Sequence, residues 1–502
     1  METPGHLTIA ADCGTAVGTG HAMRCLALAQ VWQRDGGGVT FLVPEGSPLI
    51  EERIRAEGCG LQALIKSRFA RAVVERLRPA EPGMVALDGY GFGAWEQSSL
   101  SEAGWRVLMI DDFAHASAYP ASWVLNQNVY AREEMYAQRG VDTRLLLGAS
   151  YALLRQEFHQ FLGWTRDVPD RAHRLLISIG GSDACNLSAR ILESLVLLER
   201  KDIEVVLIAG GANPHFRELQ TAVQRSQVPV RLIGNALDMP SLMAWADIAI
   251  SGAGGTSYEL CYMGLPALLF VTADNQRRVA ERLSGTMAAI CAGEAGEFDA
   301  HKFTETLRHC MESPEEREAI SNRGRELVDG MGAARVKAAM LNQEIRLRAG
   351  QQADCRLLFS WANDPEVRKA SFHSNVITWP GHQSWYAQKL ADPQSVIYIG
   401  QNWGGEPVGV VRFQMDGDRA VLSVSIAPQF RGAGFGKGLT ALSVQTLARR
   451  HSVRAVEAFV KPDNHASIHL FESCGFHRRG CTEVAGQPAL LFTWDCPRQP
   501  NA

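Results

Sequence analysis

The strongest constraint on the fold is an alternation of short apolar runs with helical patterns along the first third of the chain. The apolar runs lie at residues 6–11, 39–43, 84–88 and 107–111, and residues 21–34 have helical spacing. Apolar runs of this length that alternate with helices are typical of βαβ units. The pattern predicts a parallel sheet covered by helices.

A second series of the same kind follows. Its apolar runs lie at residues 175–179, 204–209, 231–233 and 248–250, and the polar stretch 163–173 separates the two series. Doubly wound sheets bind ligands outside the carboxyl ends of their strands. We therefore expect an α/β chain with two Rossmann-like domains, at residues 1–165 and 166–335, and a ligand site in the cleft between them.

The pattern changes after a helical segment at residues 333–347. Residues 354–362 resemble a helix, and a strand-rich region follows. This mixture predicts a third domain of the α+β class at residues 350–497. Its expected strands are 395–400, 407–413, 420–426 and 455–460.

Composition excludes several classes of protein. The 502 residues are 46% hydrophobic and 21% charged, with a formal net charge of −4, so we expect no nucleic-acid partner. No apolar run approaches the roughly 18 residues of a membrane span, and the first ten residues do not resemble a leader. The eleven cysteines form no Cys-x-x-Cys pair. We expect reduced thiols, no membrane association and a cytoplasmic location.

The loop after the first strand is the first candidate site. It contains Asp12, Gly18, Gly20 and His21, and Arg24 follows at helical spacing. Glycines at a strand-to-helix turn let backbone N–H groups approach an anion, but the third glycine of the dinucleotide fingerprint is absent. His21 is placed to act as a general base on water. Each of these residues has a structural alternative. His21 could only hydrogen-bond a neighbouring loop, Asp12 could be a turn residue, and Arg24 could be a surface charge.

Two further strands end in polar residues. Asp88 and Tyr90 follow one strand, and Asp111 and Asp112 follow another. The carboxyl ends of these strands face the expected ligand. A single aspartate pair is weak evidence for Mg²⁺, and we expect no metal ion.

The second domain carries a more specific pattern. Gly254, Gly255 and Thr256 open a helix whose first amides could hold a diphosphate, and Glu259 follows one turn later as an acceptor for ribose hydroxyls. The segment Ser178 to Asp183 ends its strand with two glycines. A solvated helix carboxylate is the alternative for Glu259, and loop capping is the alternative for the Asn275-Gln276 pair.

These residues together resemble a known family over residues 1 to about 335. They are similar to the UDP-sugar hydrolase of pseudaminic acid biosynthesis, which releases 2,4-diacetamido-2,4,6-trideoxy-L-altropyranose from UDP. The matching motifs are Gly18-Thr-Gly20-His21-Ala-Met-Arg24, Asp88-Gly-Tyr90-Gly91, Asp111-Asp112, Leu125-Asn126-Gln-Asn128, Gly148-Ala-Ser-Tyr151-Ala-Leu-Leu-Arg155-Gln-Glu157-Phe158, Gly180-Gly181-Ser-Asp183, Asn186-Leu187 and Asn275-Gln276.

The resemblance implies a GT-B-like arrangement of the two domains and a reaction without metal, in which water attacks the anomeric carbon with inversion. It implies that His21, Asp12 and Tyr90 are catalytic, with His21 as the base. The chain departs from the family beside Asp12, where Ala10 precedes and Cys13 follows. The UDP-sugar-binding residues that it implies are Gly20, Arg24, Asn126, Arg155, Gly254, Gly255, Thr256, Glu259, Asn275 and Gln276.

The third domain has its own signature. Arg431-x-x-Gly434-x-Gly436 lies at a strand-to-helix turn, where successive N–H groups can hold a pyrophosphate. With Asn464 about 30 residues later, it resembles the GNAT acetyltransferases. The resemblance implies acetyl-CoA as co-substrate, with an N–H near residues 424–426 polarising the thioester. The implied acetyl-CoA-binding residues are Val424, Ile426, Arg431, Gly432, Gly434, Gly436, Lys437 and Asn464.

Phe471 stands where many GNAT enzymes have a tyrosine that protonates the thiolate, and we interpret it as core packing. His373 and His382 are candidate bases. Within the superfamily the domain looks like the branch that acetylates UDP-4-amino-4,6-dideoxy-N-acetyl-altrosamine. The motifs are Trp361-Ala-Asn363-Asp364-Pro-Glu366-Val-Arg368, His382-x-x-Trp385 and Gly409-Val-Val-Arg412-Phe413.

The sequence therefore predicts a bifunctional enzyme with nucleotide-sugar substrates, and other enzymes of the same pathway are conceivable partners. One alternative is a GT-B glycosyltransferase fused to an acetyltransferase of different amine specificity. Another is a non-catalytic scaffold that only binds nucleotide-sugars. The stereochemistry of the sugar, the oligomeric state and channelling between the domains stay open.

Overall fold

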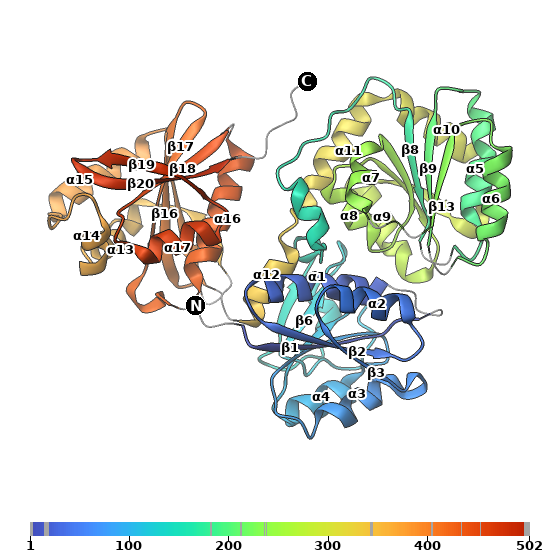
Figure 1. Ribbon diagram of the computed structural model, residues 1–502, viewed down its shortest axis with the longest axis horizontal. Helices are drawn as coiled ribbons and strands as arrows, with labels where there is room; N and C mark the ends of the chain where they lie inside the picture. The colour runs from blue at the N-terminus through green and yellow to red at the C-terminus, as the bar shows by residue number, and fades with distance from the viewer. Residues whose placement is uncertain are drawn as a thin grey trace. The chain divides into compact units, whose positions relative to one another are not determined.

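The computed structural model describes residues 4–14, 20–180, 183–210, 213–234, 236, 238–341, 345–402, 405–432, 434–451 and 453–495. Gly18, Thr19, Gly181 and Ser182 of the motifs above lie outside these residues, as does Ala433, between Arg431 and Gly434. The chain divides into two compact units, residues 2–337 and residues 338–502 (Figure 1). We call them the N-terminal unit and the C-terminal unit and describe each by itself.

The first half of the N-terminal unit is a parallel sheet of seven strands in the order β3-β2-β1-β4-β5-β6-β7. Strand order reverses between β1 and β4, so their carboxyl ends flank a switch point. Figure 1 shows α1 and α2 on one face of the sheet and α3 and α4 on the other. The elements are β1 (His6–Ala11), α1 (Gly20–Arg34), β2 (Gly38–Pro44), α2 (Pro48–Ala56), β3 (Gly60–Leu64), α3 (Phe69–Leu77), β4 (Met84–Asp88), α4 (Ala94–Glu102), β5 (Arg106–Ile110), β6 (Trp123–Asn126) and β7 (Arg144–Leu147).

The second half is a parallel sheet of six strands in the order β10-β9-β8-β11-β12-β13. Its switch point lies between β8 and β11. The prediction of two Rossmann-like folds is confirmed. The elements are β8 (Arg174–Ser178), α5 (Leu187–Ser194), β9 (Glu204–Ala209), α6 (Phe216–Arg225), β10 (Val230–Gly234), α7 (Met239–Trp245), β11 (Ile248–Gly252), α8 (Thr256–Tyr262), β12 (Ala267–Val271), α9 (Arg277–Gly285), β13 (Ile290–Glu294), α10 (Ala300–Glu312), α11 (Pro314–Leu327) and α12 (Gly332–Met340).

Helix α12, at the end of the N-terminal unit, packs against the first half of the unit. A Cβ on Gly332 would come within 2.1 Å of the Ala152 carbonyl oxygen, so only glycine allows α12 to approach so closely. Arg335 Nη1 donates to the Ser150 carbonyl over 2.7 Å, and Lys337 forms an ion pair with Asp35. These contacts join α12 to the first half of the unit.

The C-terminal unit is a mixed sheet of seven strands in the order β14-β15-β16-β17-β18-β20-β19. Only β17 and β18 are parallel, and they pair over Arg419–Val421 alone, so β17 diverges from β18 toward its carboxyl end. Its first strand, β14, precedes Gly350, where the sequence predicted the domain to begin. The strands are β14 (Arg346–Ala349), β15 (Ser395–Gln401), β16 (Pro407–Asp416), β17 (Arg419–Ile426), β18 (Ala455–Val460), β19 (His477–Val484) and β20 (Gln487–Asp495).

Helices cover both faces of this sheet. One face packs through Phe413 and Leu422 against α16 (Phe435–Arg450) and α17 (His465–Ser473). The other packs through Val410 against α13 (Cys355–Ala362) and α15 (Trp379–Ala391). The short α14 (Pro365–Ala370) lies between α13 and α15 in the chain.

Candidate active sites

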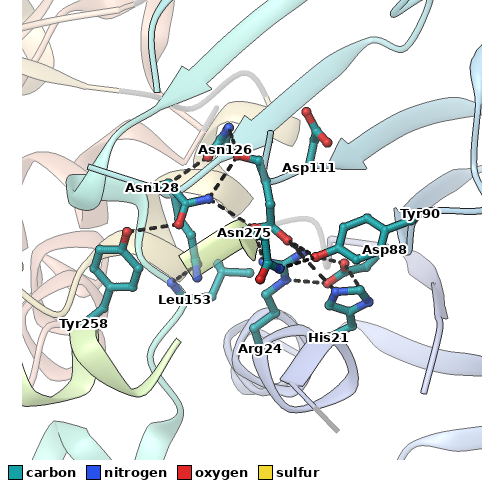
Figure 2. A network of polar contacts seen from close by, with 12 residues as sticks. His21, Arg24, Asp88, Tyr90, Asp111, Asn126, Asn128, Leu153, Tyr258 and Asn275 are labelled. Carbon is teal, nitrogen blue, oxygen red and sulfur yellow. Dashed lines mark hydrogen bonds and ion pairs between the residues drawn. The ribbon is translucent and has the colours of Figure 1, made fainter. Parts of the chain in front are cut away.

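A buried arginine organises the switch point of the first sheet. Arg24, on α1, donates through Nε to Asp88 Oδ2 and through Nη1 to Asp112 Oδ1, each over 2.7 Å. Its Nη2 reaches the second oxygen of each carboxylate, at 2.7 and 3.1 Å (Figure 2). Arg24 therefore cross-links the ends of β4 and β5. It was expected to bind UDP-sugar, but its guanidinium is occupied by two carboxylates.

The arginine keeps the Asp112 carboxylate charged. Asp88 is fully buried, and its Oδ2 also accepts a hydrogen bond from Cys25 Sγ at 3.3 Å. Burial raises the pKa of Asp112, but the charge and hydrogen bonds of Arg24 outweigh it and lower the pKa to about 2. The site thus holds one arginine side chain between two aspartate side chains.

His21 lies between the two carboxylates. Its Nδ1 is 3.7 Å from Asp88 Oδ1, and its Nε2 is 4.0 Å from Asp112 Oδ2. Within the described part of the chain, Nδ1 is buried and has no hydrogen-bond partner. The ring is 8% exposed and meets Tyr90 edge to face, with 5.0 Å between centroids. A histidine between two carboxylates can accept a proton, because both charges stabilise the imidazolium.

Tyr90 and Asn275 complete the site from opposite halves of the unit. Tyr90 Oη donates to Asp112 Oδ2 over 3.1 Å, and Asn275 Nδ2 donates to Tyr90 Oη over 3.1 Å. Asn275 lies in a 3₁₀ turn, Asp274–Gln276, directly after β12. Burial raises the pKa of the Tyr90 phenol, so it stays a donor at neutral pH. Figure 2 shows both side chains directed toward His21 and Arg24.

The Asp112 loop is held from behind by its backbone carbonyl. That oxygen accepts hydrogen bonds from Asn126 Nδ2 at 2.8 Å, Asn128 Nδ2 at 3.2 Å and Tyr130 Oη at 2.8 Å. Tyr258, on α8, donates in turn to Asn128 Oδ1 over 3.0 Å. Asn126 is fully buried, and its hydrogen bond to the Asp112 carbonyl supports the loop. Sequence reasoning missed Tyr130 and Tyr258.

Asp12 lies at the end of β1, beside His21. Its backbone N–H donates to the Asp88 carbonyl over 2.8 Å. Burial raises the pKa of its carboxyl group, and the charge of His21 opposes this. A Cβ on Gly89 would lie 2.7 Å from the Asp12 Cβ, so the Asp88-Gly89 turn needs glycine to pass this close. Gly20 opens α1 one residue before His21 and has open space around its Cα.

The expected nucleotide residues of the second half gather at the start of α8. Gly255 caps the helix, Thr256 is its first residue, and a Cβ on Gly255 would meet open space. Glu259 is one turn further and pairs with Arg155 Nη2 at 3.2 Å, while burial raises its pKa. The Glu259 carboxylate and the Arg155 guanidinium therefore form an ion pair with each other.

Gln276 folds back on the same edge of the second sheet. Its Oε1 accepts hydrogen bonds from Thr272 N at 3.1 Å and Thr272 Oγ1 at 2.9 Å. A Cβ on Gly254 would lie 3.6 Å from Gln276 Nε2. Gly254 and Gln276 are thus brought together at the switch point of this sheet.

In the C-terminal unit, a glycine-rich turn joins β17 to α16. Gly432 and Gly434 have φ angles of +76° and +84°, values that favour glycine, and Gly434 caps α16. Gly436 and Lys437 lie in the first turn of α16. The N–H groups of a helix start in such a turn form a site for an anion.

The side chains around this turn are engaged within the protein. Arg431 Nη2 pairs with Asp364 Oδ1 at 2.7 Å, and Arg431 Nε donates to the Ile426 carbonyl over 3.3 Å. Asn464 caps α17 by accepting from Ser467 N over 3.1 Å. Val424 and Ile426 lie where β17 no longer pairs with β18.

Two family models match the chain. Residues 344–477 match the acetyltransferase (GNAT) domain, and residues 175–331 match the glycosyltransferase family 28 C-terminal domain. The C-terminal unit is a GNAT acetyltransferase domain. The chain is an enzyme that joins this GNAT unit to an N-terminal unit whose second half matches the C-terminal domain of glycosyltransferase family 28.

Three relatives extend the comparison. An uncharacterized protein of Methanocaldococcus jannaschii is 22% identical over 94% of this chain and 96% of its own length. The spore coat polysaccharide biosynthesis protein SpsG of Bacillus subtilis is 24% identical over 67% of this chain and 97% of its own. The UDP-2,4-diacetamido-2,4,6-trideoxy-beta-L-altropyranose hydrolase of Campylobacter jejuni is 25% identical over 42% of this chain and 71% of its own.

Three further residues singled out in the GNAT unit are Phe471, His382 and His373. Phe471 is 4% exposed and packs against Phe476 and Phe492, which confirms core packing. His382 is buried, and its Nε2 lies 3.1 Å from the Cys355 carbonyl oxygen. Burial lowers the pKa of His382. His373 is exposed.

Among the described residues, no group of three or more His, Cys, Asp or Glu side chains could hold a metal ion. In the same residues, no helix combines the length and apolarity needed to cross a membrane.

Proposed function

We propose that the N-terminal unit hydrolyses UDP-2,4-diacetamido-2,4,6-trideoxy-β-L-altropyranose to the free sugar and UDP. The proposal is based on the position of His21, which lies between Asp88 and Asp112. Among the described residues, its buried Nδ1 has no hydrogen-bond partner. The alignment with the Campylobacter jejuni hydrolase supports the choice of substrate.

In the proposed reaction, His21 takes a proton from water while the water oxygen bonds to the anomeric carbon. The bond from that carbon to the phosphate oxygen breaks with inversion, and its electron pair leaves with UDP. Asp88 and Asp112 stabilise the imidazolium. The N–H groups at Gly255 and Thr256 hold the diphosphate, and no metal ion takes part.

The GNAT unit transfers the acetyl group of acetyl-CoA to the 4-amino group of UDP-4-amino-4,6-dideoxy-N-acetyl-β-L-altrosamine. Its turn around Gly434 holds the pyrophosphate of acetyl-CoA, and an N–H of β17 beyond its pairing with β18 polarises the thioester carbonyl. The amine attacks the carbonyl, CoA leaves as the thiolate, and the amine proton is lost. The product is the substrate of the hydrolysis.

The test is a reaction of the purified chain with acetyl-CoA and the UDP-amino-sugar, followed by mass spectrometry and NMR. We expect free diacetamido sugar, UDP and CoA, and no acetylated product when acetyl-CoA is omitted. His21→Ala should stop UDP release and leave acetyl transfer intact, so that the acetylated UDP-sugar accumulates. Loss of both activities in His21→Ala would contradict two separable sites.

A sugar transferase is the second candidate for the N-terminal unit. Residues 175–331 match a glycosyltransferase domain, and a donor UDP-sugar would occupy the same site. In that case the acetylated UDP-sugar would persist with water alone. A glycoside would form only after a suitable acceptor was added.

We further propose that the enzyme acts in the cytoplasm, where nucleotide-sugars and acetyl-CoA are both available. Other enzymes of the same pathway are its expected partners. Co-purification of the tagged chain with the enzymes that supply the amine and consume the sugar would test this.

A further inference from the structure

Two arginines of the GNAT unit lack an acidic partner. Arg412 lies on β16 and Arg368 on α14. Among the residues that the structure describes, neither forms an ion pair with Asp or Glu. Arg412 Nη2 donates to Ser423 Oγ over 2.8 Å, and Arg368 Nη1 donates to the carbonyl oxygens of His373 at 2.8 Å and Asn375 at 3.3 Å. Both positive charges remain uncompensated.

Both guanidinium groups are partly removed from water. The Nε atoms of Arg368 and Arg412 are buried and have no hydrogen-bond partner within the described residues. Burial lowers the pKa of Arg412, and the positive charge of Arg368 adds to that shift. Two like charges in a half-buried position are unfavourable without an anion.

A hydroxyl group and an aromatic ring lie beside the pair. Ser423 and Ser425 alternate along β17 and therefore project from the same face of the sheet. Ser425 pairs with Val410, whose side chain packs against α13 and α15, so this is the face that the two helices cover. Ser425 Oγ is buried without a partner in the described chain. The Arg412 guanidinium lies over the Trp385 ring, 5.4 Å from its centroid.

The segment that carries Arg368 is fastened near the proposed reaction centre. Asp364, which caps α14, pairs with Arg431 of the glycine-rich turn. Beyond the helix, Lys461 lies over the Phe372 ring, and Gln487 Nε2 donates to the Phe372 carbonyl over 2.8 Å. Lys461 directly follows β18, whose carboxyl end separates from that of β17. Arg431, which pairs with Asp364 and donates to the Ile426 carbonyl, thus connects α14 to the carboxyl end of β17, where Ser425 precedes Ile426.

We propose that Arg368 and Arg412, together with the Ser425 hydroxyl, bind a phosphate group of the acetyl acceptor. The acceptor is then a nucleotide-linked or phosphorylated amine and not a free amino sugar or a polyamine. Paired arginines match phosphate oxygens through several charge-assisted hydrogen bonds, whereas a cationic amine would be repelled. This inference rests on the proposed acetyl transfer and assigns the residues that hold the nucleotide phosphate of its acceptor.

The first test counts UDP sites on the full chain by equilibrium dialysis, with CoA present at saturation. We expect two UDP molecules per chain. Gly255→Trp should remove the site of the N-terminal unit, because the new side chain fills open space there. Arg412→Gln should weaken the other site by about 10- to 100-fold. Arg454→Gln is the matched control, since Arg454 is an exposed arginine of the same unit paired with Asp418.

The outcomes separate this inference from the proposed hydrolysis. A single UDP site that Gly255→Trp abolishes would overturn the phosphate site and leave the hydrolase assignment standing. A single site that only Arg412→Gln weakens would support the phosphate site and count against the hydrolase. Unchanged CoA affinity in Arg412→Gln shows that the unit is folded, and Arg412→Lys should recover part of the UDP affinity.

The second test compares the UDP-linked amine with the free 4-amino sugar as acceptors. For the UDP-linked amine, Arg368→Gln and Arg412→Gln should each raise KM by about 10-fold or more with little change in kcat. The weak activity on the free amine should not change. Equal losses on both acceptors would mean that the arginines only support the fold, and the proposal would fail.

Discussion

Tyr90 and Asn275 join the two halves of the N-terminal unit through one hydrogen bond, in which Asn275 Nδ2 donates to Tyr90 Oη over 3.1 Å. The same hydroxyl group donates to Asp112 Oδ2, beside His21. A contact between the halves is thus coupled to the carboxylate that faces the candidate base.

Tyr90→Phe removes the hydroxyl group and keeps the ring against His21. We expect kcat/KM for UDP release to fall by about 10- to 100-fold, because a hydrogen bond to a charged group is lost. Acetyl transfer, measured on the same protein sample, serves as the control and should not change. If the Tyr90→Phe variant kept the wild-type kcat/KM for UDP release, the hydroxyl group would have no role in hydrolysis.

Arg24→Met leaves Asp88 and Asp112 as uncompensated buried charges. We expect the free energy of unfolding of the N-terminal unit to fall by about 3–5 kcal/mol in urea titrations. Arg55→Met is the control, because Arg55 is 62% exposed and its pair with Glu51 is worth about 0.5 kcal/mol or less. Equal, small effects of both substitutions would show that Arg24 does not organise the site.

The lowered pKa of Asp112 makes the free energy of unfolding depend on pH. Its pKa of about 2 is below the value of an unfolded chain, so its stabilising contribution is complete above pH 4 and is lost as the pH falls toward 2. The wild-type advantage over Asp112→Asn in free energy of unfolding should shrink by about 2 kcal/mol between pH 6 and pH 2.5. Urea titrations at several pH values measure this difference, and a constant advantage would contradict it.

Gly434→Asp places a side chain and a negative charge in the turn before α16. The φ angle of +84° makes any side chain strained, and the carboxylate would repel a pyrophosphate. We expect the Kd of CoA to rise by at least 10-fold while UDP release stays unchanged. Gly405→Asp is the matched control, because it introduces the same side chain at a glycine with a φ angle of +81° and open space around it. Similar CoA binding by both variants would argue against a pyrophosphate site.

Part of the fold could be predicted from local patterns. The strands β1, β4 and β8 are nearly continuous apolar runs because helices cover both faces of each sheet, and such runs are visible in the sequence. The strand β19 was missed, since seven of its eight residues are exposed and its sequence, His477–Val484, is rich in charge. The short β6 and β7, of four residues each, were also missed, because pairing with neighbours defines them more than their own pattern.

The sequence by itself determined which residue types stand at the strand ends and helix starts: His21, Asp88 and the glycines of both anion turns. Only the tertiary structure decided their partners. Arg24 has the pattern of a surface charge, yet its carboxylate partners lie 64 and 88 residues away along the chain. The pairing order of the strands brings these ends together, and burial then fixes their charges. A local pattern encodes the element, whereas the chemistry of a site depends on contacts between distant elements.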